Sequence, residues 1–189
     1  MKQIIWLAGL LVLVAVGTGA VIWSGAYNIA ADEAHWPLTE RLMETVRDRS
    51  IAARASDVVA PALDDESLIR KGAGNYDAMC AGCHLEPGED HTELSAGLYP
   101  APPNLVHDRI DDPAEAFWII RHGIKMTGMP AWGKSMEDEY IWGMVAFLQQ
   151  LPEMSADQYH ELVEASEGHS HGSGEAHVHD DDEHHEHKD

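Results

Sequence analysis

The sequence predicts an all-helical protein, because every regular element that its patterns indicate is a helix. An unbroken apolar run covers Ile4–Trp23, and apolar residues repeat every four positions within 37–54. Further helices begin after capping side chains near 64 and at 112. These observations divide the chain into four parts: a membrane anchor at 1–30, a connector at 31–63, a folded domain at 64–152, and a disordered acidic tail at 153–189.

Residues 1–30 are predicted to anchor the chain in a membrane. The run Ile4–Trp23 contains no charged residue, and twenty helical residues span about 30 Å, the thickness of the hydrocarbon core of a bilayer. Lys2, the only basic residue before the run, favours a cytoplasmic N-terminus. The sequence therefore predicts a single span in the inner membrane, with the rest of the chain in the periplasm. The alternative is a cleaved signal peptide with Ser24-Gly25-Ala26 as its small-residue site, which exports the same residues.

The connector is predicted to form an amphipathic helix over about 37–54. Leu38, Leu42 and Val46 lie on one face of this helix, and charged residues lie between them. This apolar face has two possible partners: the domain that follows it, or a membrane surface or partner subunit.

The chemistry of the chain is concentrated in Cys80-Ala81-Gly82-Cys83-His84. Cys-x-x-Cys-His is the attachment pattern of a c-type haem: the two thiols add across the vinyl groups of the haem, and the histidine ligates the iron. A four-thiolate zinc site would need a second pair, and Cys80 and Cys83 are the only cysteines. A redox-active dithiol does not need His84. We therefore predict one covalent haem c with His84 as the proximal ligand.

The segment 123–133 supplies candidates for a second axial ligand. Met129 stands between Gly128 and Pro130, which can fix its sulfur at one point. A thioether raises the reduction potential of the iron. We predict Met129 as the distal ligand, with Met126 as the alternative. A histidine ligand is the third possibility, from His91, His107 or His122.

The pocket walls are predicted from two regions. Leu98–Leu105 carries three prolines, so it forms a stiff, extended loop whose apolar residues favour burial at the haem. A helix follows, capped by Asp112 with Pro113 at its first position and ended by Gly123. The predicted wall residues are Tyr99, Leu105, Trp118 and Trp132.

Two glycines lie inside the helix that leads into the cysteine motif. Gly72 and Gly74 each cost about 1 kcal/mol relative to alanine, so we expect another helix to approach closely there. The last helix of the domain is predicted to begin at Ser135 and to end at Leu151-Pro152. Its apolar stripe can pack across the glycines: Ile141, Val145 and Leu148.

These motifs together resemble a class I monohaem cytochrome c domain, similar to those of cbb3-oxidase subunits and alcohol-dehydrogenase cytochrome subunits. The resemblance covers about 65–152, and it implies an all-helical fold whose first and last helices cross near the haem. It also implies electron transfer, His84 and Met129 as axial ligands, and support of His84 by the carbonyl of Pro103 or Pro102. The motifs that carry it occur in order: Gly72-x-x-x-Tyr76-x-x-x-Cys80, the cysteine motif, the proline loop, Gly128-Met129-Pro130-Ala131, Ile141-Trp142 and Phe147-Leu148.

The leading interpretation is a membrane-anchored periplasmic cytochrome that carries single electrons between a donor and an acceptor protein of a respiratory chain. A six-coordinate iron leaves no site for a small-molecule substrate, so we expect a carrier rather than an enzyme such as a peroxidase. The formal net charge of −21 excludes nucleic acid, which needs a basic face. The first alternative is an electron-entry haem subunit of a larger membrane oxidoreductase complex.

The second alternative is a haem protein that handles metal through its tail. Imidazole and carboxylate side chains are ligands for Zn and Cu, and the tail is rich in both. The histidines concerned are His169, His171, His177, His179, His184, His185 and His187.

Overall fold

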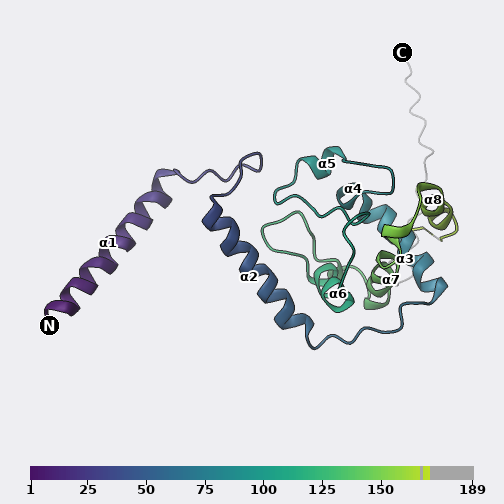
Figure 1. The fold of residues 1–189 in the computed structure, drawn as a ribbon, viewed down its shortest axis with the longest axis horizontal. Coiled ribbons are helices and arrows are strands. Elements are labelled where there is room, and N and C mark those ends of the chain that lie inside the picture. Colours follow the sequence, from purple (N-terminus) through teal and green to yellow (C-terminus); the bar gives the residue numbers. More distant parts are fainter. Residues whose placement is uncertain (167, 171–189) are drawn as a thin grey trace, which may run out of the picture. The chain divides into compact units, whose positions relative to one another are not determined.

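The computed structural model describes residues 1–166 and 168–170 (Figure 1). The described part is built of helices and contains no strand, which confirms the predicted all-helical class. The chain divides into two compact units, Met1–Glu44 and the residues from Thr45 onward. Each unit is described by itself.

The first unit contains α1 (Lys2–Ser24), an apolar helix with no buried residue. By length and composition α1 can cross a membrane, as predicted for this segment. It ends at Gly25, whose φ of 66° lies in the left-handed region that glycine adopts without strain. Beyond it, Tyr27 shares a 2.7 Å hydrogen bond with Nδ1 of His35 and meets the ring of Trp36 edge-on. The segment after α1 therefore has contacts of its own.

The predicted connector helix is present as α2 (Pro37–Ala55), which runs from the first unit into the second. Near its C-terminal end, Ile51 and Ala55 are buried. The predicted apolar face is instead exposed at Leu38, Leu42 and Val46. The helix thus has a buried face that the four-residue repeat did not reveal.

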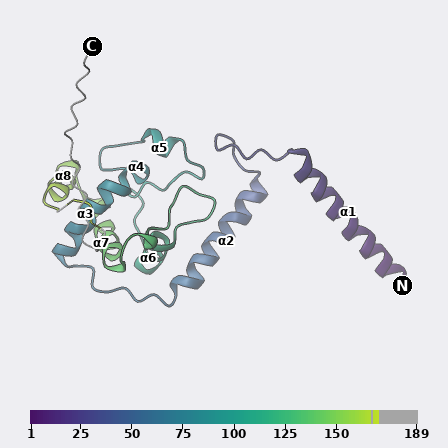
Figure 2. The ribbon, with the colours of Figure 1, turned by 180° about the vertical axis from the view of Figure 1, so that it is seen from behind.

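The helices of the second unit pack around one core, seen from two sides in Figures 1 and 2. α3 (Glu66–Met79) packs on α7 (Asp138–Leu148) and on α8 (Ala156–Glu164), and α6 (Pro113–His122) packs on α7. Short elements join them: α4 (Ala81–His84), α5 (Glu93–Ala96), η1 (Trp132–Lys134) and η2 (Leu151–Glu153). The largest fully buried side chains include Tyr76, Ile141, Phe147, Leu151 and Tyr159. Burial of such apolar side chains contributes about 1.5–3 kcal/mol each.

α3 crosses α7 closely at Gly72, as predicted for this glycine. Gly74, the other glycine for which a close helix was predicted, instead faces Ser166 and Gly168, beyond the end of α8. A Cβ placed on Gly72 would lie 2.0 Å from the carbonyl oxygen of Gly143, and one on Gly143 would lie 3.1 Å from the carbonyl oxygen of Leu68. Both contacts are with backbone, which cannot move aside as a side chain would. The two helices therefore require glycine at this point.

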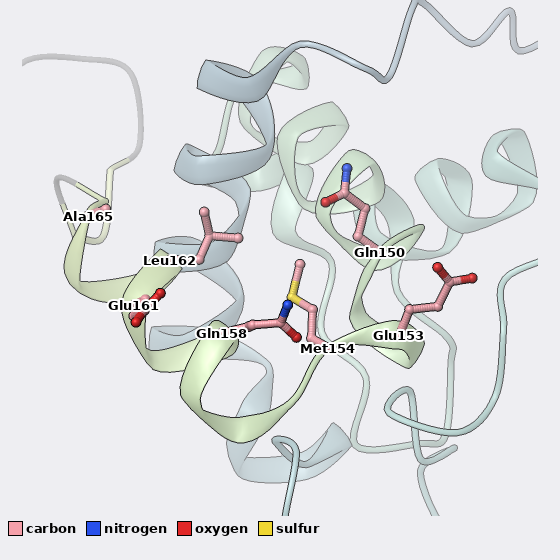
Figure 3. A pocket seen from close by; sticks show the side chains of 7 residues that line it. All are labelled: Gln150, Glu153, Met154, Gln158, Glu161, Leu162 and Ala165. Atoms are coloured by element: carbon pink, nitrogen blue, oxygen red, sulfur yellow. The ribbon is translucent and has the colours of Figure 1, made fainter.

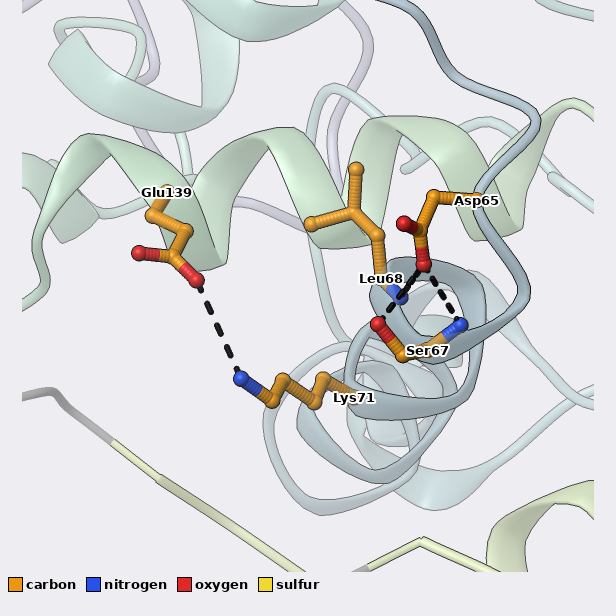
Figure 4. A network of polar contacts seen from close by, with 5 residues as sticks. All are labelled: Asp65, Ser67, Leu68, Lys71 and Glu139. Atoms are coloured by element: carbon orange, nitrogen blue, oxygen red, sulfur yellow. Dashed lines mark hydrogen bonds and ion pairs between the residues drawn. The ribbon is translucent and has the colours of Figure 1, made fainter.

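The start of α3 is fixed by a side-chain cap (Figure 4). Asp65 accepts hydrogen bonds from the backbone N–H groups of Ser67 at 2.8 Å and Leu68 at 3.1 Å, and from the Ser67 hydroxyl at 2.6 Å. The hydroxyl of Ser67, followed by these N–H groups, lowers the pKa of the Asp65 carboxyl. One turn further along, Lys71 pairs with Glu139 of α7 at 3.8 Å, an exposed ion pair that contributes little.

The final predicted helix begins later than expected. Ser135–Glu137 forms a turn and α7 starts at Asp138, because the N–H of Met136 bonds back to the carbonyl of Trp132 and the Met136 side chain is buried. The helix also ends at Leu148, before the predicted stop.

The predicted boundary at residue 152 lies too early. Ser155 caps α8 in a reciprocal capping box with Gln158, and Tyr159 on α8 is fully buried. The Tyr159 hydroxyl donates to Asp77 of α3 at 2.9 Å, and burial, followed by this bond, raises its pKa. Leu162 and Val163 of α8 also pack against the core cluster. This short apolar pattern was not recognised in the sequence as part of the folded domain.

We predict that Gly72→Ala destabilises the folded domain by about 1–3 kcal/mol or more, because the new methyl group has no room between two backbones. Gly82→Ala is the control, since its Cβ would come no closer than 3.9 Å to Leu94. Denaturant unfolding followed by helical circular dichroism measures both. Equal stability of the two variants would contradict the tight crossing.

Candidate functional site

A cavity of about 860 Å³ opens in the second unit, beside the end of α3. Its volume lies within the range of about 300–1,000 Å³ that is usual for cofactor and ligand sites. Its walls come from the second half of α2, α3, α4, the proline loop, α6, the loop that contains Met129, η1 and α7. Most of the lining is apolar: Ile51, Met79, Leu98, Leu105, Ile110, Ile119, Ile120, Ile124, Met129, Trp132 and Leu148.

Cys80, Cys83 and His84 line this cavity from one short turn. α3 ends at Cys80 and α4 begins at the next residue, so the chain changes direction there. The carbonyl oxygen of Cys80 accepts from the N–H of Cys83 at 3.0 Å and from that of His84 at 2.8 Å. The turn therefore presents both thiols and the imidazole to the same space.

Cys80 and Cys83 are not joined by a disulfide. Burial, with a smaller contribution from Cys83, raises the pKa of the Cys80 thiol to about 12. Catalytic Cys-x-x-Cys pairs have a lowered thiol pKa that supplies a thiolate at neutral pH. The raised pKa of Cys80 is the opposite of what such a pair requires.

The His84 ring is oriented by the proline loop. Nδ1 of His84 lies 2.9 Å from the carbonyl oxygen of Pro103, so Nδ1 carries the proton and Nε2 is left with its lone pair. Burial lowers the pKa of His84, although the bond to Pro103 opposes this effect. The ring is therefore neutral at neutral pH, as a metal ligand must be. The N–H of Leu105 donates to the His84 carbonyl at 3.3 Å and ties the same loop to α4.

A buried hydrogen bond fixes the backbone just after His84. The hydroxyl of Tyr76, on α3, donates to the carbonyl of Leu85 at 2.7 Å, and burial raises its pKa. Leu85 has a φ of 71°, which is unusual for a branched residue. The Tyr76 hydrogen bond thus ties α3 to the strained backbone that directly follows the cysteine motif.

Met129 lines the cavity from the loop between α6 and η1. Its backbone N–H and its backbone carbonyl both make hydrogen bonds. Its N–H donates to the Thr127 hydroxyl at 3.1 Å, and its carbonyl accepts from the N–H of Ile124 at 3.2 Å. A Cβ on Gly123 would lie 2.7 Å from the Met129 carbonyl oxygen, so glycine is needed where this loop closes. Met126 is 81% exposed and does not line the cavity. Of the two methionines in this loop, Met129 is therefore the one that lines the cavity.

The structure corrects two of the predicted wall residues. Tyr99 does not line the cavity, although its neighbours Leu98 and Pro100 do, because successive side chains of an extended chain point in opposite directions. Trp118 does not line it either, and its ring packs on His122. Here α6 presents a different face to the cavity: Ala116, Ile119 and Ile120. The other predicted wall residues, Leu105 and Trp132, do line the cavity, and so do Pro102 and Pro103, the two candidates for supporting His84.

None of the three alternative histidines, His91, His107 and His122, lines the cavity. Of the tail histidines, only His169 is among the described residues, and its Nε2 lies 2.8 Å from the sulfur of Met79. The remaining tail candidates lie outside the described residues: His171, His177, His179, His184, His185 and His187. Within the part of the chain that the structure describes, no group of three or more His, Cys, Asp or Glu is placed to hold a metal ion.

The contribution of α2 is the part of the site that the sequence did not predict. Its second half lines the cavity through Arg47, Asp48, Arg49, Ile51 and Ala52. The apolar repeat at Leu38, Leu42 and Val46 marks another face of the helix. The single Ile51 among charged residues was the only signal of this face.

A second hollow of about 720 Å³ lies between η2 and α8 (Figure 3). It contains none of the predicted site residues, and its lining is mixed: Gln150, Glu153, Met154, Gln158, Glu161, Leu162 and Ala165. Without a cysteine, histidine or aromatic wall, it offers no chemistry comparable to that of the first cavity.

The helical core and its cavity, with a Cys-x-x-Cys-His turn facing a loop methionine, define a class I cytochrome c domain. Residues 67–148 match the family model described as cytochrome c oxidase, cbb3-type, subunit III, and this match supports a cytochrome c domain of the cbb3 type in that segment. The match leaves out α1, α2 and α8. No curated protein and no solved structure matched the chain.

A cytochrome c domain implies haem c, and the residues present fit that cofactor. The cavity has the size and apolar lining that a flat macrocycle needs, and it presents two thiols and a neutral imidazole on one side. A soft thioether donor comes from Met129.

Proposed function

We propose that this protein is a membrane-anchored periplasmic c-type cytochrome that carries single electrons between redox proteins. The observation that supports it most is the cavity itself, which brings the Cys80–His84 turn and Met129 together from segments far apart in the sequence. Haem bound there supplies a one-electron Fe(III)/Fe(II) couple.

In this proposal Cys80 and Cys83 hold one haem covalently, through thioethers. Nε2 of His84 is the proximal ligand, because Nδ1 is committed to the Pro103 carbonyl. The sulfur of Met129 is the distal ligand. With both axial positions filled by the protein, the iron offers no position to a small-molecule substrate, so the protein carries electrons and is not itself an enzyme.

The proposed location follows from α1. An apolar helix that begins at Lys2 is placed across the inner membrane with its N-terminus in the cytoplasm. The haem domain is then exported, and covalent attachment keeps the cofactor from being lost outside the cell. Donor and acceptor proteins of a respiratory chain are the proposed partners.

We predict that Met129→Ala abolishes the weak long-wavelength band of the oxidised spectrum that reports methionine–iron ligation. The midpoint potential falls as well, because the thioether that favours Fe(II) is removed. Met126→Ala is the control, and we expect it to leave both unchanged, since its side chain is exposed. Persistence of the band in Met129→Ala would overturn the distal assignment.

A second candidate function is an electron-entry haem subunit of a larger membrane oxidoreductase. The matched family is described as a subunit of an oxidase. In addition, α2 exposes Leu38, Leu42 and Val46 at 81%, 60% and 56%, a stripe of apolar side chains that suits contact with another subunit.

For the subunit function, we predict that purification from membranes in mild detergent yields a stoichiometric oxidoreductase with the cytochrome. Replacing Leu38, Leu42 and Val46 by serine then releases that enzyme, because the apolar contact is lost. Glu44→Gln on the same helix is the control and retains it. A wild-type cytochrome that purifies alone supports the independent carrier instead.

A third proposal concerns the histidine-rich tail, which has the donor types to bind Zn or Cu. We predict that deleting residues 171–189 removes Zn²⁺ binding measured by titration calorimetry and leaves the haem spectrum unchanged. This deletion retains the bond between the N–H of Ser170 and the Asn75 side chain on α3, so the folded domain keeps its contacts. Equal Zn²⁺ affinity of the truncated and full-length chains would exclude the tail as the binding site.

A further inference from the structure

The cavity has an unusual balance of charge for a site that receives an anionic cofactor. Its lining includes one carboxylate from α2, Asp48, and three from the start of α6, Asp111, Asp112 and Glu115. Haem brings two more carboxylates, on its propionate side chains. Where these carboxylates leave water, they need cations or hydrogen-bond donors facing them.

Arg47 and Arg49 are the only Lys or Arg side chains in the cavity lining. Both belong to the second half of α2, outside the segment that matches the cytochrome family. The neutral His84 is committed to Pro103 through Nδ1, so it does not replace them. The positive charge available to the cofactor therefore comes from α2 alone.

The two arginines are available for such pairing. Arg47 is half-buried and uses Nε on the neighbouring Asp48 at 2.8 Å, and among the described residues its two terminal nitrogens have no partner. Arg49 makes no hydrogen bond or ion pair within the described part of the chain. On α6, in contrast, Asp112 is already occupied as the helix cap, accepting from the N–H of Ala114 at 2.8 Å.

The packing of α2 supports a role for the cofactor in positioning this helix. Ile51 and Ala55 are buried, yet neither belongs to the main core cluster formed by the other helices. The wall that α2 contributes is therefore formed around the cavity and not around the core. A cofactor in the cavity would complete the contacts of this helix.

We infer that Arg47 and Arg49 pair with the haem propionates and thereby hold the second half of α2 over the cofactor as a wall that the cytochrome domain itself does not provide. This inference rests on the proposed function, because it needs haem in the cavity. Guanidinium groups suit the task, since their planar forks match carboxylate geometry.

The pairing has two measurable consequences. A nearby positive charge disfavours the oxidised iron, so loss of the arginines lowers the midpoint potential at mildly alkaline pH, where the propionates are ionised. A cation also lowers the pKa of a paired carboxylate. Without the arginines the propionates titrate at a higher pH, and the pH at which the potential starts to rise on acidification moves upward.

The test uses the full-length protein, matured with haem and purified in detergent, and compares wild type with Arg47→Gln/Arg49→Gln. The charge-matched control is Arg54→Gln/Arg70→Gln, because neither of these arginines lines the cavity. Covalent haem is first counted by pyridine haemochrome spectra. Potentiometric titration across pH and limited proteolysis of the link between α2 and α3 then follow for each variant.

We expect the cavity variant, Arg47→Gln/Arg49→Gln, to have a lower midpoint potential than wild type and faster cleavage at 56–65. The pH at which its potential starts to rise on acidification should also be higher. The control should follow wild type, because exposed charges are screened by solvent and salt. Arg47→Lys/Arg49→Lys should restore the potential, since it restores the charge. Identical pH profiles for the cavity variant and the control would overturn the inference. A wild-type chain without covalent haem would instead overturn the proposed function, and the inference with it.

Discussion

The crossing of α3 over α7 is the contact on which the rest of the domain depends. Where Gly72 meets Gly143 the two backbones touch, so neither helix can slide or rotate without a clash. α3 ends two turns later at Cys80, and the sulfur of Met144, on α7, lies 3.9 Å from the Cys80 thiol. A contact between two residues without side chains thus determines where the attachment turn stands relative to the core.

The two proposed axial ligands are positioned by hydrogen bonds within loops and not by the helix crossing. His84 and Met129 come from segments without long helices, and each is held through short bonds to backbone or hydroxyl groups. The Pro103 carbonyl orients the imidazole from a loop that proline stiffens, and the Thr127 hydroxyl holds the N–H of Met129. Such loops lose little freedom when the cofactor binds, so the ligands are placed before the iron arrives. This preorganisation suits an electron carrier, whose two oxidation states should differ little in geometry.

The sequence predicted the features that depend on rigid local chemistry. The cysteine motif, Gly72 at the crossing, the Asp112 cap and the methionine between Gly128 and Pro130 each leave few structural alternatives. Tyr99 and Trp118 were misplaced because apolar character does not reveal which way a side chain points. The face of an extended loop or helix that meets the cavity depends on tertiary packing, as Leu98 and Ile119 illustrate. For the same reason, the short apolar pattern of Tyr159, Leu162 and Val163 was not enough to separate α8 from the acidic tail.

Two helices outside the family match, α2 and α8, were predicted incompletely from the sequence. α8 joins the core through Tyr159, Leu162 and Val163, whereas α2 has only a narrow contact with the cavity, through Ile51 and a few residues beside it. A narrow contact leaves the remaining surface of a helix free for other partners, and on α2 that surface is the exposed stripe around Leu42. In this chain, α2 therefore adds a cavity wall and an exposed apolar surface to a domain whose proposed haem ligands all lie within the matched segment 67–148.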